Sequence, residues 1–417
     1  MYQLKNRTSC TAFAFGLALM AQAQAGTPVS FVFTADPLFG INRGVFHEDK
    51  AIDARYANRE MVEKINTLPG ITFPNDGELQ AGQSISGIDF VVVGGNIGSR
   101  SEVTGIIQSA EDSWKDFQKV YVDGLQVKDH NGLRAPLFVE PGNQDVSNAI
   151  GYYKKMEPAK DPSVLVGIYN AMMNPAAPLT SKNFDVAVNK IHYSRDVGGI
   201  HLVFVNVWPD SAERAWMETD LANRPAGSPV ILFSNVSPDV ATSLLTNPNG
   251  KHDINKDDKF ENVIPEVFQG GTKVDDKSTI HERALAVFVK KHPEIKAYFH
   301  GNQAVSDLKV WLGPDADFLL PTFSADSPVK GTISAKQEEL VSFFVATVDV
   351  DAKQLTVREC FWNKEPKQKH GPLAWGNHTT FDFRAEETTP APEPTPSPEP
   401  TPTVTDSVSG NGQPVVP

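Results

Sequence analysis

The sequence predicts an α/β fold in a single domain, because apolar stretches typical of buried strands alternate with amphipathic stretches typical of helices. Each apolar run ends in a small or polar turn, and amphipathic segments lie between several of the runs. Such alternation is the arrangement of a mostly buried sheet with helices packed on it. The predicted strands are residues 30–36, 88–96, 135–143, 200–207, 229–235 and 295–302.

Two helices and a hairpin complete the pattern. Residues 109–125 place Phe117 and Tyr121 on one face, as an amphipathic helix does. Residues 279–292 begin with a capping-box pair and continue with apolar residues at helical spacing. Near the C-terminus two alternating apolar runs flank the turn at 351–354. We therefore expect an antiparallel section late in the fold.

The first 25 residues have the features of a secretory signal peptide. Lys5 and Arg7 precede an apolar run too short to span a bilayer, and small residues then offer a cleavage site after Ala25. We expect a secreted or periplasmic protein whose charge, without these two cations, is -13 - 2 = -15. Cys360 is then its single cysteine, which we expect to be free and largely buried in the late hairpin.

The last 33 residues differ in composition from the rest. Residues 385–417 are rich in Pro, Thr and Glu and contain almost nothing to bury. This composition predicts an extended, disordered tail. The folded domain is therefore expected to cover residues 27–384, without an internal linker.

Composition excludes several classes of partner. The formal charge of -13 argues against a nucleic-acid partner, since phosphate backbones are bound by clusters of Lys and Arg. No stretch after the N-terminal segment is long and apolar enough to span a membrane. The acidic loop 253–258 has some spacing of a calcium loop but lacks its glycine at position six and its glutamate at position twelve. We interpret it as a solvated loop.

Polar side chains follow the predicted strands at the positions where α/β sheets bind ligands. Each of these residues alone is typical of an ordinary turn. Asp36 can stabilise a turn before a proline, and Asn143 and Asp145 can bond to their own loop. Together they form an ordered series, which consists of Asp36, Asn96, Asn143, Gln144, Asp145, Asn235 and Asn302.

In this order and at these separations, the series resembles the calcineurin-like metallophosphoesterase family. That family reads D-x-H, G-D, G-N-H-D, a lone His and G-H-x-H, each after a strand. The resemblance covers nearly all of residues 29–362. It implies a two-sheet β-sandwich flanked by helices, and a site where two metal ions activate a water and hold a phosphate.

The match fails at most of the family's metal-binding positions. Asp36, Asn143 and Asp145 are retained. The replacements are Leu38 for the first histidine, Asn96 for the bridging aspartate, Gln144 for the catalytic histidine, Asn235 for the lone histidine, and Asn302 and Ala304 for the last pair. His300 lies close to the last motif and is placed in the pocket, although a near-core position for it stays open.

These replacements remove the chemistry that the family needs. Leu and Ala cannot bind a metal, and amides are weak oxygen donors. Gln144 cannot carry a proton near neutral pH as histidine can. Asp36 and Asn143 remain as the only expected metal ligands, and both are weak remnants. We therefore expect no catalytic residue and no cofactor, or at most one weakly bound divalent ion.

Three interpretations follow. The first is an exported pseudoenzyme that keeps the family's hydrolase fold as a non-catalytic binding or structural module. The second is a divergent metal-dependent phosphoric ester hydrolase that uses an altered site with one ion held by Asp36, Asn143 and nearby carbonyls. The third is a protein that binds a phosphate- or sugar-containing ligand in the former pocket through its amides. The sequence names no partner.

Overall fold

The structure is a computed structural model, which describes residues 26–99, 108–146, 160–186, 188–239, 280–368 and 371–384. The predicted signal peptide, the acidic loop 253–258 and the Pro-rich tail lie outside the described residues. The chain divides into two units, Met1–Phe383 and Arg384–Pro417, and the fold described below belongs to the first.

The first sheet has six strands in the order β14-β13-β12-β1-β4-β5. Strands β1, β4 and β5 are parallel, and β12, β13 and β14 extend the sheet in antiparallel fashion. All residues of β1 and β4 are buried, in keeping with their apolar sequences. The bounds are β1 Val29–Ala35, β4 Phe90–Gly94, β5 Leu137–Val139, β12 Ser342–Asp349, β13 Gln354–Phe361 and β14 Ala374–Asp382.

The second sheet also has six strands, in the order β10-β11-β9-β8-β7-β6. Its four central strands are parallel, and both edge strands are antiparallel to their neighbours. A separate hairpin joins β2 Asn42–Phe46 to β3 Asp49–Asp53. The bounds of the second sheet are β6 Tyr193–Val197, β7 Ile200–Phe204, β8 Val230–Ser234, β9 Ile295–His300, β10 Asp307–Trp311 and β11 Leu320–Ser324.

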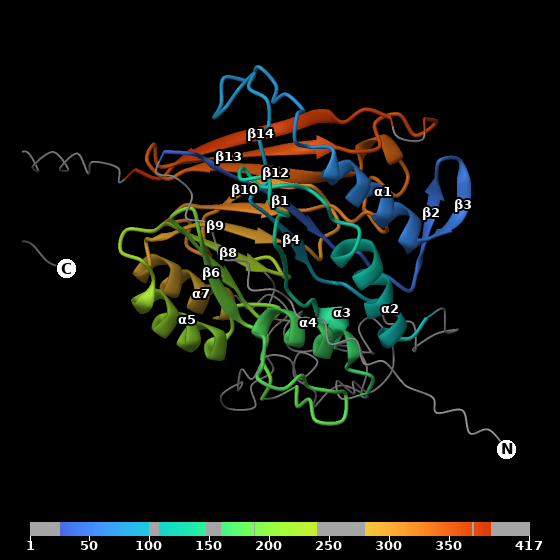
Figure 1. The fold of residues 1–417 in the computed structure, drawn as a ribbon. Helices are drawn as coiled ribbons and strands as arrows, with labels where there is room; N and C mark the ends of the chain where they lie inside the picture. The colour runs from blue at the N-terminus through green and yellow to red at the C-terminus, as the bar shows by residue number, and fades with distance from the viewer. Residues whose placement is uncertain are drawn as a thin grey trace, which may run out of the picture. The chain divides into compact units, whose positions relative to one another are not determined.

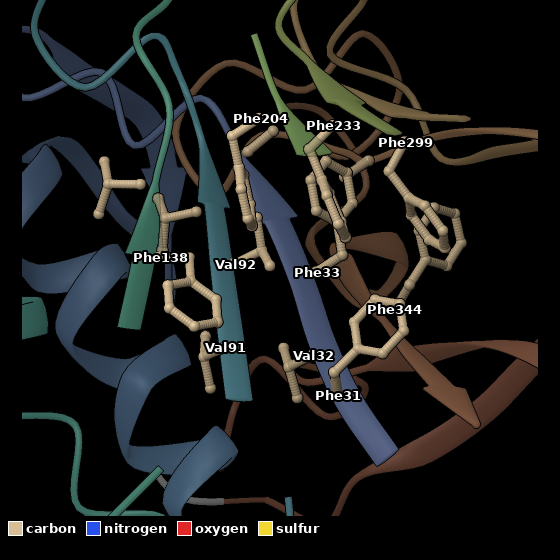
Figure 2. Close-up of a cluster of buried hydrophobic side chains, with 14 of the residues drawn as sticks. Phe31, Val32, Phe33, Val91, Val92, Phe138, Phe204, Phe233, Phe299 and Phe344 are labelled. Carbon is tan, nitrogen blue, oxygen red and sulfur yellow. The ribbon is translucent and has the colours of Figure 1, made fainter. Parts of the chain in front are cut away.

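Phenylalanine rings fill the space between the two sheets (Figure 2). On β1, Phe31 and Phe33 point towards the second sheet, where both lie against Phe299 with ring centroids 5.4 and 5.2 Å away. Phe233 and Phe204 continue the layer, 4.8 Å apart. Truncating one such ring to Ala costs about 3–5 kcal/mol in a typical core. This layer fixes the sheets face to face, and with them the strand ends that carry the site.

Helices cover the outer faces. On the first sheet, Thr34 of β1 donates to Met61 Sδ of α1, and α2 and α4 pack beside it. On the second sheet, Trp311 Nε1 donates to Glu282 of α7, which lies next to α5 (Figure 1). The bounds are α1 Ala54–Asn66, α2 Ala110–Phe117, a π-helical turn Gln118–Val122, α3 Asn143–Val146, α4 Ser163–Met173, α5 Ser211–Asn223, α7 Ile280–Lys291 and a 3₁₀ turn Glu338–Leu340.

The architecture confirms the predicted two-sheet α/β sandwich flanked by helices. The late hairpin is present as β12 and β13, paired from Asp349 with Gln354. The helix predicted over 109–125 begins after the cap Ser109, but changes to a π-helical turn at Gln118. Among the described helices, none has both the length and the apolar composition needed to cross a bilayer.

Candidate functional site

Five of the predicted strand ends meet at one edge of the sandwich. Asp36 follows β1 and Asn96 follows β4 in the first sheet. Asn143 begins α3 after β5, and Asn235 and Asn302 follow β8 and β9 in the second sheet. Because β1, β4 and β5 are parallel, their carboxyl ends lie side by side, and the core layer sets the ends of β8 and β9 opposite them. Direct hydrogen bonds join Asp36, Asn96 and Asn302 in one group and Asn143 and Asn235 in another. Hydrogen bonds of Gln144 and Gly95 link the two groups.

Asp36 lies at the centre of this network with only 2% of its surface exposed. Its Oδ1 accepts from the backbone N–H of Asn96 at 2.9 Å and from Asn96 Nδ2 at 3.0 Å. Its Oδ2 accepts from the backbone N–H of Asn302 at 2.6 Å. Burial raises the pKa of this carboxyl to about 6, although the three hydrogen bonds oppose the rise, and the charge of Asp145 adds to it.

The Asn96 side chain links three strand ends. Besides Asp36, its Nδ2 donates to Asn302 Oδ1 at 3.2 Å. Its Oδ1 accepts from the backbone N–H of Gln144 at 2.6 Å. A neutral amide can donate and accept in this way at once, whereas an aspartate here would set a second negative charge against Asp36.

Asn235 joins the second sheet to the first. Its side chain is fully buried, its Oδ1 accepts from the backbone N–H of Asn143 at 3.1 Å, and its Nδ2 donates to the Gly95 carbonyl at 2.5 Å. The Asn143 side chain is different, because its Oδ1 is buried and has no hydrogen-bond partner in the described part of the chain. Asn235 therefore acts as a polar connection between the sheets.

Asp145 holds the loops on either side of Asn96 and Asn143. Its two oxygens accept backbone hydrogen bonds from Ile97 at 2.9 Å, Gly98 at 2.7 Å and Gly142 at 2.8 Å. A buried carboxylate that accepts three backbone N–H hydrogen bonds stabilises the backbone around it. Asp145 positions the loops, in line with the interpretation that it stabilises its own loop.

His300 does not join the cluster, which corrects its placement in the pocket. It is the last residue of β9, and Phe299 before it points into the core. Because side chains alternate along a strand, the His300 ring lies on the opposite face of the second sheet. There it is fully buried, and its Nδ1 lies 3.0 Å from the Gly301 carbonyl oxygen. Burial lowers its pKa to about 4, so the ring is neutral at neutral pH.

The loops of the site keep backbone conformations that non-glycine residues seldom adopt. Asp36, Leu38, Asn302 and Ala304 have φ of 54°, 48°, 62° and 50°, and the β-branched Val207 after β7 has φ of 68°. Such conformations cost of order 1–3 kcal/mol each and cluster at functional sites. The site therefore retains unusual backbone geometry although Leu38 and Ala304 offer no polar atom to a ligand.

Sequence analysis missed Glu140, which ends the run before the loop of Asn143. Its carboxyl group is fully buried, and neither oxygen has a hydrogen-bond partner among the described residues. Burial, together with the negative charge of Asp36, raises its pKa well above the usual range of a glutamate. A signal existed, since strand alternation from the core residue Phe138 points Glu140 towards the second sheet.

The residues present do not fit a pair of transition-metal ions. A carboxylate oxygen has two lone pairs, and both on Asp36 Oδ1 are occupied by Asn96 donors. Asn96 Oδ1, where the family resemblance places a bridging carboxylate, is neutral and accepts from Gln144. In the described ranges no group of three or more His, Cys, Asp or Glu side chains is arranged to hold a metal ion. Apart from the carboxylate of Asp36, the polar groups that meet at the site are side-chain amides and backbone groups.

Comparisons with known proteins give structural likeness alone. No protein-family model and no curated protein matches the sequence. A dimetal phosphatase from Danio rerio is similar over 86% of this chain and 100% of its own, with 8% identity and a TM-score of 0.47. A predicted phosphoesterase from Streptococcus pneumoniae is similar over 86% of this chain and 99% of its own, with 9% identity and a TM-score of 0.29. At these values the likeness says nothing about what this chain does.

Proposed function

We propose that this chain is an exported, metallophosphoesterase-like protein that has lost two-metal hydrolysis and acts as a non-catalytic binding or structural module. The hydrogen-bonding of Asp36 supports this proposal most directly. The carboxylate retained at the first metal position accepts hydrogen bonds from Asn96 and Asn302. A metal ion at Asp36 Oδ1 would have to displace a donor of Asn96, because both lone pairs of that oxygen are occupied. Side-chain amides stand at positions where the family has metal-binding side chains.

The network also explains why replacing single residues should not restore activity. Gln144→His adds an imidazole but leaves Asn96 donating to Asp36. Asn96→Asp adds the bridging charge but puts two carboxylates about 3 Å apart, which costs stability until a cation is bound. Groups that act as a unit are not additive, so restoration requires the whole set.

The test is turnover of aryl phosphate mono- and diesters by the purified protein loaded with manganese or zinc. We expect no turnover above the rate of an identically prepared Asp36→Ala variant, and less than about 0.1 ion per chain after desalting, which suits a site without three strong ligands. Turnover that is present in the wild type and absent in Asp36→Ala would overturn the proposal in favour of a divergent hydrolase.

A restored variant checks that the backbone still suits the family's chemistry. It combines Leu38→His, Asn96→Asp, Gln144→His, Asn235→His, Asn302→His and Ala304→His. We expect manganese to raise its melting temperature and to leave that of the wild type unchanged. Equal responses of the two proteins would show that the replaced positions do not decide metal binding.

A further inference from the structure

Helix α5 has three acidic residues, and each of them lies against a histidine. The pairs are Glu213 Oε1 with His192 Nδ1 at 3.1 Å, Glu218 Oε2 with His292 Nε2 at 3.2 Å, and Asp220 Oδ2 with His201 Nε2 at 2.9 Å. The histidines come from three segments, since one precedes β6, one belongs to β7 and one follows α7. Contacts of one kind thus join α5 to three neighbouring parts of the chain.

Few apolar side chains hold α5 in place. Among its 13 residues, Met217 and Leu221 are the only apolar ones that are buried, whereas all five buried residues of α4 are apolar. A groove also lies between α5 and α7, lined by Ala215 on one side and by Val287 and Phe288 on the other. Because burial of apolar surface is the main force that docks a helix, the histidine pairs carry a large share of the attachment of α5.

The surroundings of these rings favour their charged form. His292 lies between two carboxylates, with Nε2 3.2 Å from Glu218 and Nδ1 3.2 Å from Glu294. A neutral imidazole has one N–H and can donate to only one of them. The ring of His192 is stacked on the indole of Trp216 in α5, with centroids 4.4 Å apart, and a charged ring is attracted to the face of an indole. Loss of the charge therefore weakens both contacts.

His201 gives the sign of the pH dependence. Its two ring nitrogens lie 2.7 Å from Asp196 and 2.9 Å from Asp220. Burial lowers the pKa of His201, but Asp220 and Asp196 outweigh burial and raise the pKa above 6.5. A group with a raised pKa in the folded protein contributes stability that is fully present below its unfolded pKa, and this stability is lost as the pH rises through the folded pKa. The attachment of α5 is therefore strongest below about pH 6.5.

The other charged groups around the three pairs are carboxylates, lysines and an arginine, whose usual pKa values lie outside the range from pH 6 to pH 8.5. They are Asp196, Asp210, Glu294, Lys190, Lys291 and Arg224. Burial lowers the pKa of Lys190, and loss of its charge at higher pH would weaken its attraction to Glu213 in the same direction.

We propose that His192, His201 and His292 form a pH-sensitive switch, which holds α5 on the second sheet at mildly acidic pH and lets it detach as the pH rises. The switch adjoins the candidate site. Glu213 also accepts from the backbone N–H of Asn206 at 3.2 Å, and the carbonyl of the next residue, Val207, accepts from the backbone N–H of Asn235 at 3.1 Å. The inference does not depend on whether the protein hydrolyses phosphate.

The experiment is hydrogen–deuterium exchange of the purified full chain between pH 6 and pH 8.5, read by mass spectrometry of peptides from α5 and α4. Each rate is divided by the rate of an unstructured peptide at the same pH, which gives a protection factor. The protection of α5 should fall roughly ten-fold or more relative to that of α4, because a shift of one pKa unit at one histidine is a factor of ten. Helix α4 serves as the reference because it carries no charged side chain.

A variant that combines Glu213→Gln, Glu218→Gln and Asp220→Asn removes the three charges at nearly equal volume. Its α5 should be less protected than that of the wild type at pH 6 and should lose the dependence on pH. The matched control is Glu111→Gln with Asp112→Asn on α2, where both acids pair with a lysine, and it should keep the wild-type behaviour.

Two results would overturn the inference. One is a wild type in which the ratio of α5 to α4 protection stays constant from pH 6 to pH 8.5, a measurement that requires no variant to fold. The other is a triple variant whose α5 protection falls with pH as the wild type's does. Neither result involves the phosphatase assay, so this inference can fail while the proposed function stands.

Discussion

His201 is a residue whose partners require it to carry a charge. Its ring is almost fully buried on β7, with Nδ1 2.7 Å from Asp196 Oδ1 and Nε2 2.9 Å from Asp220 Oδ2. A neutral imidazole has one N–H, so it cannot donate to both carboxylates. Burial lowers the pKa of His201, but the hydrogen bonds and charges of Asp220 and Asp196 outweigh it and raise the pKa above the usual value of 6.5.

The raised pKa of His201 makes the stability of the protein fall as the pH rises. Because the folded pKa exceeds the unfolded one, the stabilisation by His201 is fully present below about pH 6.5 and is lost as the pH rises through the folded value. The wild type should therefore have a larger unfolding free energy than His201→Gln at pH 6, and this difference should become smaller as the pH rises to 9. Urea unfolding at several pH values measures it. The partly exposed His378→Gln serves as control, and a constant gap for His201→Gln would contradict the assignment.

Residue types predicted part of the site, and long-range packing decided the rest. The order of Asp36, Asn96 and Asn235 after their strands sufficed to predict that they belong together. Glu140 escaped notice, since a glutamate near a strand end usually points to solvent, and its carboxyl group lies against Gly94 of a different strand. His300 was misplaced because the last motif does not determine which residues of the strand face the core. A shift of one residue along a strand moves a side chain to the other face of the sheet.

Among the elements, α2 and α4 approach so closely that a glycine is required. A methyl group on Gly167 of α4 would overlap the indole ring of Trp114 on α2. Alanine would favour the helix by about 1 kcal/mol, but overpacking costs about 1–3 kcal/mol. Gly167→Ala should therefore lower the unfolding free energy, by up to about 2 kcal/mol, in chemical denaturation.

The matched change is Gly44→Ala on β2, where a Cβ would meet nothing within 4 Å. This variant should be neutral or slightly more stable, because alanine restricts the unfolded chain. If the two variants behaved alike, the close approach of α2 and α4 would not limit the size of residue 167.

The difference between buried and exposed elements explains which of them could be predicted. The six predicted runs became buried strands because continuous apolar sequence has few alternatives to a covered sheet. The edge strands β6, β10 and β14 and the β2–β3 hairpin were missed, since most of their residues are only half-buried or exposed and give no continuous apolar run. Strand β11 was also missed, although it is largely buried. The break of the helix at Gln118 into a π-helical turn likewise has no signal in its own residues.

For the whole molecule, Cys360 reports the integrity of the sandwich. Its thiol is free, fully buried in β13 and flanked by β12 and β14. Burial, with the negative charge of Glu359, raises its pKa, so little reactive thiolate forms. We expect a thiol reagent to label Cys360 in guanidinium but not under native conditions, except at a rate that follows global unfolding. Mass spectrometry of the Cys360 peptide measures this, and fast native labelling would refute it.

The position of β14 determines how the protein would respond to mechanical load. Among the described residues this strand pairs on one side only, with β13, and the chain continues from it into the C-terminal segment. Tension applied through that segment would enter at Asp382, opposite Gln354, and peel the strand away one pair at a time. Strand β1, by contrast, is bonded on both sides, by β12 and β4. A pull from the C-terminal side would therefore detach β14 while the strand ends around Asp36 stay assembled.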